Sequence, residues 1–131
     1  DEFEIMKTHS KFGGEMLAKA NEKFKLEFKK DSFLKVASDI AMYHHEKYNG
    51  TGYPEGLKAE EIPMCARVVA IVDVYDALRS KRVYKDGFSH KKSVEIIKSE
   101  RGVSFDPLLV DIFLSIEDKF DKVFYDLSKD Y

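Results

Sequence analysis

The side chains best suited to chemistry are three histidines and an aspartate, placed where a helical core would carry apolar residues. His9 continues an apolar stripe at helical spacing, and His44 and His45 stand together at the end of a second such stripe. A single imidazole on an inner face is most often paired with a backbone carbonyl. Three imidazoles favour a metal, because one ion serves several groups that would each need a partner.

Asp73 is the most unusual carboxylate, because it lies within the apolar run 69–74 with alanines on its own helical face. Burying an ionised carboxylate is costly unless a cation or several donors meet it. The bland alternative is a salt bridge to Arg67 or Arg79. Histidine and carboxylate without a thiolate suit iron, manganese or zinc, and paired ions are typical of displacement at phosphorus. We therefore predict a His/Asp metal site with hydrolytic function.

The elements that must position these residues are helices. The spacing predicts a first helix over about residues 3–20, a fraying end or connector over 21–30, and a second helix from Asp31 or Ser32 to about Glu46. The residues expected to face inward are Phe3, Met6, His9, Gly13, Leu17 and Ala20 on the first helix and Phe33, Ala37, Ile40 and His44 on the second.

Two loops and three more helices are expected after the second helix. Tyr48 to Pro63 carries three glycines and two prolines, which favour an ordered loop without helix or strand. A third helix begins at Pro63 and runs to about Ser80, and a second loop covers residues 81–88. A fourth helix is expected to begin after Ser89 as N-cap, with a solvated His90, and to be terminated by Gly102. Asp106-Pro107 opens a fifth helix. Its residues expected to face inward are Leu109, Ile112, Phe113, Ile116 and Phe120. The fold class is all-α.

Composition excludes several classes of protein. The 131 residues are 44% hydrophobic, too apolar for a disordered segment, and no uninterrupted apolar run approaches the roughly 18 residues of a membrane span. The formal charge of −2 argues against coating nucleic acid or an anionic membrane. A length of 131 residues suggests one domain with one core. The single cysteine, Cys65, rules out an internal disulfide and fits a reducing cytosol, so we expect a cytoplasmic location.

The stretch His44 to Leu57, HHEKYNGTGYPEGL, resembles the signature of HD-GYP domains. Later blocks match in order: Ile62-Pro63, Ala66-Arg67, Asp73 to Leu78, Arg82 to Lys85, Gly102 and Phe105 to Pro107. Upstream, Glu4 to His9 resembles the family helix that carries a metal-binding histidine. We expect a single HD-GYP domain over residues 1–131, a helical bundle of the HD-domain type, with Tyr48 to Pro63 as its GYP loop.

The resemblance implies a bacterial phosphodiesterase that hydrolyses cyclic di-GMP to pGpG or GMP, with a binuclear or trinuclear iron or manganese centre. The residues that match the family's metal ligands are His9, His44, His45 and Asp73. Arg82 and Lys85 match the pair that holds the dinucleotide phosphates, and Tyr53 stands in the loop beside the metal cleft. Arg79 and Val83, beside that cation pair, replace the residues usual in the family, Thr and Pro.

The family's His-Asp dyad and the lysine that follows it lie upstream of the His9 helix, so the domain is expected to be N-terminally incomplete. No catalytic residue is therefore identified. In the family this aspartate bridges the metals. The chain by itself is expected to bind metal weakly and to be a very poor phosphodiesterase.

Two other functions compete with this one. The first is a non-catalytic signalling module whose GYP loop docks a partner such as a diguanylate cyclase. The second is an HD-superfamily phosphohydrolase for another nucleotide, against which the GYP loop argues. The C-terminal aromatic residues either cover the core, which is the usual role at helical spacing, or form a homodimer face; they are Phe120, Phe124, Tyr125 and Tyr131.

Overall fold

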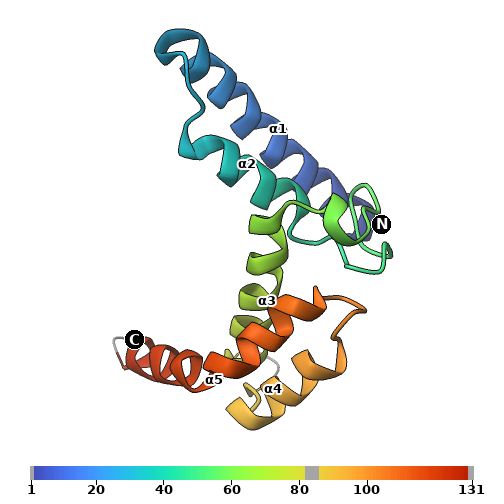
Figure 1. The fold of residues 1–131 in the computed structure, drawn as a ribbon, viewed down its shortest axis with the longest axis vertical. Coiled ribbons are helices and arrows are strands. Elements are labelled where there is room, and N and C mark those ends of the chain that lie inside the picture. The colour runs from blue at the N-terminus through green and yellow to red at the C-terminus, as the bar shows by residue number, and fades with distance from the viewer. Residues whose placement is uncertain (1, 82–85, 130–131) are drawn as a thin grey trace. The chain divides into compact units, whose positions relative to one another are not determined.

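The computed structural model describes residues 2–81 and 86–129, except the side chain of Phe3, and is all-α within these ranges, as predicted (Figure 1). The helices are α1 (Glu2–Phe28), α2 (Phe33–Tyr43), α3 (Met64–Arg79), α4 (His90–Ser99) and α5 (Pro107–Ser128), with a short 3-10 helix η1 (Ala59–Glu61). No helix in these ranges is long and apolar enough to cross a membrane. The backbone forms two compact units, Asp1–Ala70 and Ile71–Tyr131. The assignment of residues 1–131 to one HD-GYP domain stays a prediction.

In the first unit, α1 and α2 lie side by side as a helical hairpin (Figure 1). Asn21 is buried, and its side-chain oxygen accepts hydrogen bonds from the backbone N–H and the hydroxyl of Ser32, at 2.9 and 2.8 Å. Ser32 caps α2 by accepting from the N–H of Leu34, as predicted. The expectation of a fraying end or connector over residues 21–30 is wrong for residues 21–28, which continue α1, because this contact holds the last turns of α1 against the start of α2.

The buried face of α1 differs from the predicted stripe. Gly14 and Asn21 are buried, and the Ser38 hydroxyl of α2 donates to the Gly14 carbonyl at 2.8 Å. This contact shows which face of α1 meets α2. The residues expected to face inward that are instead exposed are Met6, His9, Ala20 and Phe33.

The core of the second unit lies between the end of α3, α4 and α5. Its buried apolar side chains are Ile71, Tyr75, Val94, Ile97, Phe105, Val110 and Phe113. The predicted caps are confirmed, since Ser89 accepts from the Lys92 N–H and Asp106 from the Leu108 N–H. Ile112 was expected to face inward on α5, but it is 48% exposed.

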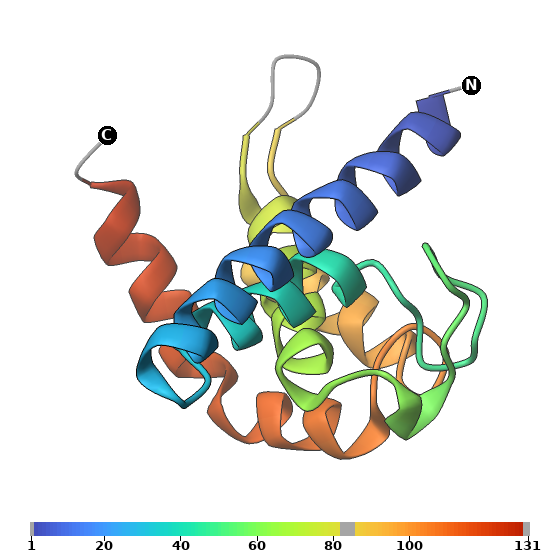
Figure 2. The ribbon, with the colours of Figure 1, turned by 90° about the horizontal axis from the view of Figure 1, so that it is seen from above.

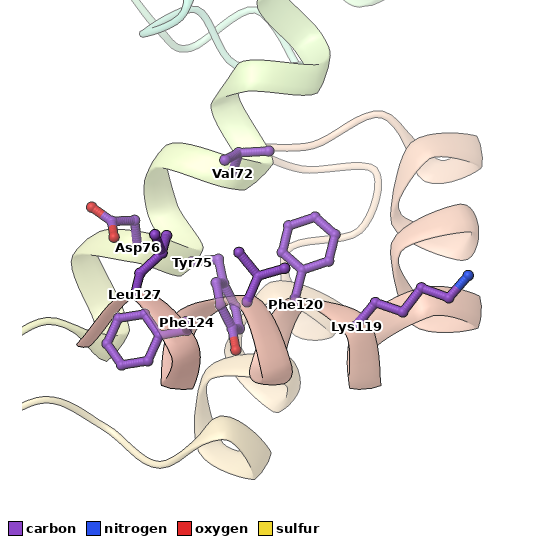
Figure 3. Close-up of a pocket in the computed structure, with 8 residues that line it drawn as sticks. Val72, Tyr75, Asp76, Lys119, Phe120, Phe124 and Leu127 are labelled. Atoms are coloured by element: carbon purple, nitrogen blue, oxygen red, sulfur yellow. The ribbon is translucent and has the colours of Figure 1, made fainter. Parts of the chain in front are cut away.

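An apolar pocket of about 360 Å³ opens between α3 and α5 in the second unit (Figure 3). Its lining consists of Val72, Tyr75, Asp76, Lys119, Phe120, Val123, Phe124 and Leu127. Phe120 meets Tyr75 and Phe113 edge-on, so it belongs to the core as expected. Tyr125 is 59% exposed, and Tyr131 lies outside the described residues.

Candidate metal centre and GYP loop

The histidine pair follows directly on the last turn of α2. The ring centroids of His44 and His45 lie 3.9 Å apart, and both residues are half-buried. The Nδ1 atom of His44 lies 2.7 Å from the Ile40 carbonyl oxygen. A carbonyl can only accept, so Nδ1 is the donor of this hydrogen bond, and Nε2 is the ring nitrogen left to bind an ion. Metal-binding histidines are oriented in this way, by a hydrogen bond from the ring nitrogen that does not bind the ion.

The GYP loop folds back onto this pair. The ring of Tyr53 stacks on that of His45 with centroids 4.9 Å apart and planes inclined by 21°, and the Tyr53 N–H donates to the His45 carbonyl. A Cβ atom on Gly52 would lie 2.6 Å from the Cα of Glu46, so only glycine allows this approach. The loop therefore places an aromatic ring next to the histidines.

Glu46 is the structural residue that the sequence analysis missed. It is only 3% exposed, and its two carboxylate oxygens accept from the backbone N–H groups of Glu55 and Leu57, at 2.7 and 3.0 Å. Hydrogen bonds to a charged acceptor are stronger than neutral ones. The available signal was a carboxylate between two histidines and a glycine-rich loop, where many backbone N–H groups need an acceptor.

Local hydrogen bonds complete the GYP loop. The side-chain oxygen of Asn49 accepts from both the N–H and the hydroxyl of Thr51, at 3.1 and 2.6 Å. An isolated antiparallel bridge joins Asn49 to Lys58, and the Ala59 N–H donates to the Tyr48 carbonyl. The prediction of an ordered loop is confirmed, although residues 59–61 form η1 where no helix was expected.

His9 and Asp73 do not lie on buried faces. Both are exposed, His9 on α1 in the first unit and Asp73 on α3 in the second. Within the second unit the buried residues of α3 include Ile71 and Tyr75, which stand about 160° around the helix from Asp73. Asp73 was expected to be buried and is not, so burial gives it no need of a cation, although an exposed carboxylate is still able to bind one.

The metal site as a whole stays a prediction. Among the described residues, no three or more His, Cys, Asp or Glu side chains form a group that could hold an ion. His44 and His45 are the two predicted ligands whose rings adjoin. Arg82 and Lys85, predicted to hold phosphate, lie outside the described residues.

Arg79 and His90, which flank residues 81–88 in the sequence, have surroundings that differ from those predicted. Arg79, one alternative partner for Asp73, instead pairs with Asp121 at 2.6 Å, and this hydrogen bond lowers the pKa of the Asp121 carboxyl. His90 was expected to be solvated, but its Nδ1 lies 2.9 Å from the Tyr75 hydroxyl. Burial raises the pKa of Tyr75.

Comparisons with known proteins agree with the expected fold class. The HD-domain family matches residues 1–109. The chain is 48% identical over 120 residues to a cyclic di-GMP phosphodiesterase of Vibrio cholerae, covering 92% of this chain and 24% of that protein. It is 40% identical over 114 residues to a cyclic di-GMP phosphodiesterase response regulator of Xanthomonas campestris, covering 87% and 28%.

A solved structure shares the fold. The structure of a cyclic GMP-AMP specific phosphodiesterase from V. cholerae superposes with a TM-score of 0.64 at 23% identity, over 88% of this chain and 24% of that one. The chain thus spans about a quarter of the length of the curated relatives named above.

Proposed function

Since the chain belongs to the HD-domain family, we propose that it forms part of a metal-dependent phosphodiesterase that hydrolyses cyclic di-GMP. The observation that carries the proposal is the His44–His45 pair, in which the Ile40 carbonyl orients His44 for metal binding. Relatives at 40% and 48% identity, named for this activity, support the choice of substrate. Hydrolysis breaks one P–O ester bond by addition of water to give pGpG, and a second such step gives GMP.

The metal would be iron or manganese, two or three ions per complete domain, held by His9, His44, His45 and Asp73. Imidazole and carboxylate donors without thiolate suit these ions. When bound, the metal supplies Lewis-acid polarisation of the phosphoryl group. His44 contributes by presenting its Nε2 atom in a fixed orientation.

The remaining residues would bind the substrate. Tyr53 is held beside His45 by stacking and by its backbone N–H, which supports a role of its side chain in contacting the dinucleotide. Arg82 and Lys85 would neutralise the phosphates, which favour cations with several N–H donors. A substrate of this signalling class fits a cytoplasmic location.

Metal content is the first test. The chain is purified anaerobically with iron(II) or manganese(II), and ions per chain are measured for the wild type, for His44→Ala/His45→Ala and for His90→Gln. His90 is the matched control, because it is a half-buried histidine that pairs with Tyr75. Metal lost in the double variant and kept in His90→Gln supports the proposal. Equal metal in all three contradicts the assigned ligands.

Activity is then measured on the full-length protein, with cyclic di-GMP and cyclic GMP-AMP offered separately. Preferential hydrolysis of cyclic di-GMP, abolished in His44→Ala/His45→Ala, is the expected result. Preferential hydrolysis of cyclic GMP-AMP would contradict the proposed substrate and would match the substrate named for the solved structure described above. Hydrolysis unchanged in the double variant would show that the histidine pair has no part in the reaction.

The order of the GYP loop favours one alternative, a docking module for a diguanylate cyclase or another partner. Glu46 and backbone hydrogen bonds hold the loop, while Thr51, Glu55 and Gly56 are exposed. Binding through this surface should survive chelation of metal and the His44→Ala/His45→Ala substitutions. Loss of partner binding on chelation would exclude a metal-independent docking role.

A further inference from the structure

The second half of α5 carries one side of the apolar pocket. Ile116 has non-helical backbone angles, φ −128° and ψ 15°, and α5 changes direction there (Figure 2). The buried residues of α5, Val110 and Phe113, both precede this bend. The part of the helix after the bend lines the pocket together with the later turns of α3, so it presents apolar side chains to the surface (Figure 3).

Three aliphatic residues of the pocket are open to water. Val72 is 42% exposed, Val123 56% and Leu127 60%. The rings of Tyr75 and Phe120, by contrast, pack edge-on with centroids 5.5 Å apart, so they join the pocket to the core. A hollow with exposed aliphatic side chains around it is typical of a protein interaction surface, because covering it removes apolar area from water.

The pocket has one acidic end and one basic end. Asp76 and Leu127 lie toward one end, and Lys119 lies toward the other (Figure 3). Both charged side chains are exposed, and within residues 2–81 and 86–129 neither takes part in an ion pair. A partner that covers the pocket therefore gains by placing a cation near Asp76 and an anion near Lys119. We call the surface formed by Val72, Asp76, Lys119, Val123 and Leu127 the pocket face.

A second copy of the chain offers this arrangement of charges. In a two-fold interface the same surface is used twice, so a contact between two residues occurs once on each side of the axis. When two pocket faces meet with their α5 helices antiparallel, Lys119 of each copy lies opposite the end that carries the partner's Asp76 and Leu127. Val123 is midway between Lys119 and Leu127, about 6 Å along the helix from each, and so falls near the axis. The aliphatic stem of the lysine then covers the partner's leucine while its ammonium group reaches the carboxylate.

We propose that the pocket between α3 and α5 is a homodimer interface, in which the pocket face of a second copy covers it and Lys119 of each copy pairs with the partner's Asp76. This inference does not depend on the proposed hydrolysis. It transfers the homodimer role considered for the C-terminal aromatic residues to the exposed aliphatic residues and the two charges beside them.

The first test is the oligomeric state of the 131-residue chain, measured by sedimentation equilibrium over a range of protein concentrations. The variant is Leu127→Glu, and the matched control is Leu108→Glu, since Leu108 is a leucine of the same helix that is 63% exposed and lies outside the pocket. We expect the wild type to dimerise reversibly. Leu127→Glu should raise the dissociation constant at least about a hundredfold, because each substitution acts twice in a two-fold interface, and Leu108→Glu should leave it within about twofold.

Charge reversal then tests the pairing itself. Asp76→Lys and Lys119→Glu should each raise the dissociation constant at least about tenfold, because each places like charges at both ends of the interface. An equimolar mixture of the two variants should dimerise as the wild type does, because the heterodimer again joins opposite charges at both ends. Lys122→Glu reverses an exposed lysine of α5 outside the pocket and should have no effect.

A monomeric wild type would overturn the inference, even if another protein were found to bind the pocket. Equal dissociation constants of Leu127→Glu and Leu108→Glu would overturn it as well. A mixture of Asp76→Lys and Lys119→Glu that stays monomeric would exclude the two-fold pairing. Circular dichroism compares the helical content of all variants, and recovery in the mixture shows that both charge variants are folded.

Discussion

Replacing Glu46 by glutamine should loosen the GYP loop. Both carboxylate oxygens accept backbone N–H groups, from Glu55 and Leu57, and the side chain is almost completely buried. Glutamine has nearly the same shape but offers one oxygen and one NH₂ group. One of the two backbone N–H groups would therefore face another donor and lose its partner.

The size of the effect follows from these two bonds. A hydrogen bond to a charged group contributes about 1.5–3 kcal/mol, and a donor left unsatisfied adds its own desolvation penalty. Glu46→Gln removes one such bond and makes the other neutral, so we expect a loss of about 2–4 kcal/mol in the free energy of unfolding. In a chain of this size that corresponds to a fall in Tm of roughly 10 °C.

The control is the same substitution at Glu61, which lies in η1 near the end of the GYP loop. Its carboxylate accepts from the Lys58 N–H at 2.9 Å but is exposed, so Glu61→Gln should cost well under about 1 kcal/mol. Urea denaturation gives the free energies, and hydrogen exchange of the Glu55 and Leu57 amides reports the loop itself. The reasoning is refuted if the two variants agree within about 0.5 kcal/mol and the exchange of both amides is unchanged.

Three further outcomes are expected. Asp121→Asn should destabilise the protein at neutral pH. Since Arg79 lowers the pKa of Asp121, the difference in stability between wild type and variant should disappear as the pH falls through that lowered pKa. Urea titrations at several pH values between acid and neutral measure this difference. Ser89→Ala removes the N-cap of α4 and should cost about 1 kcal/mol by urea denaturation. Tyr53→Ala should lower stability by about 1 kcal/mol more than Tyr53→Phe, because phenylalanine keeps the stack on His45; equal stabilities of the two variants would show that the stack contributes nothing.

Local signals predicted the starts of several helices. Ser32, Ser89 and Asp106 each accept a backbone N–H two or three residues later, and such contacts depend on neighbours in the sequence alone. The ordered loop around Gly52 was predictable for the same reason. Its recognition as part of a GYP signature depended on the order of residue types and needed no knowledge of packing.

Faces of helices were harder to predict, because a face is chosen by the partner that packs against it. On α1 the apolar spacing suggested a stripe through Met6 and His9, whereas the contact with Ser38 of α2 is made by Gly14. Similarly, His90 follows a cap and was expected in water, but Tyr75 from a different helix reaches it. Hydrophobic periodicity gives the width of a buried stripe more readily than its direction.

The residues expected to do chemistry and the residues that hold them in place are of different kinds. His9 and Asp73 are exposed, whereas Glu46 and Tyr75, which have no assigned role in the reaction, are buried and hydrogen-bonded. A buried polar group must satisfy its hydrogen bonds, so it tolerates few backbone arrangements. An exposed ligand carries no such constraint and depends on the loop or helix beneath it. Substitution of Glu46 should therefore disturb the geometry around His45 while leaving every predicted ligand in the chain.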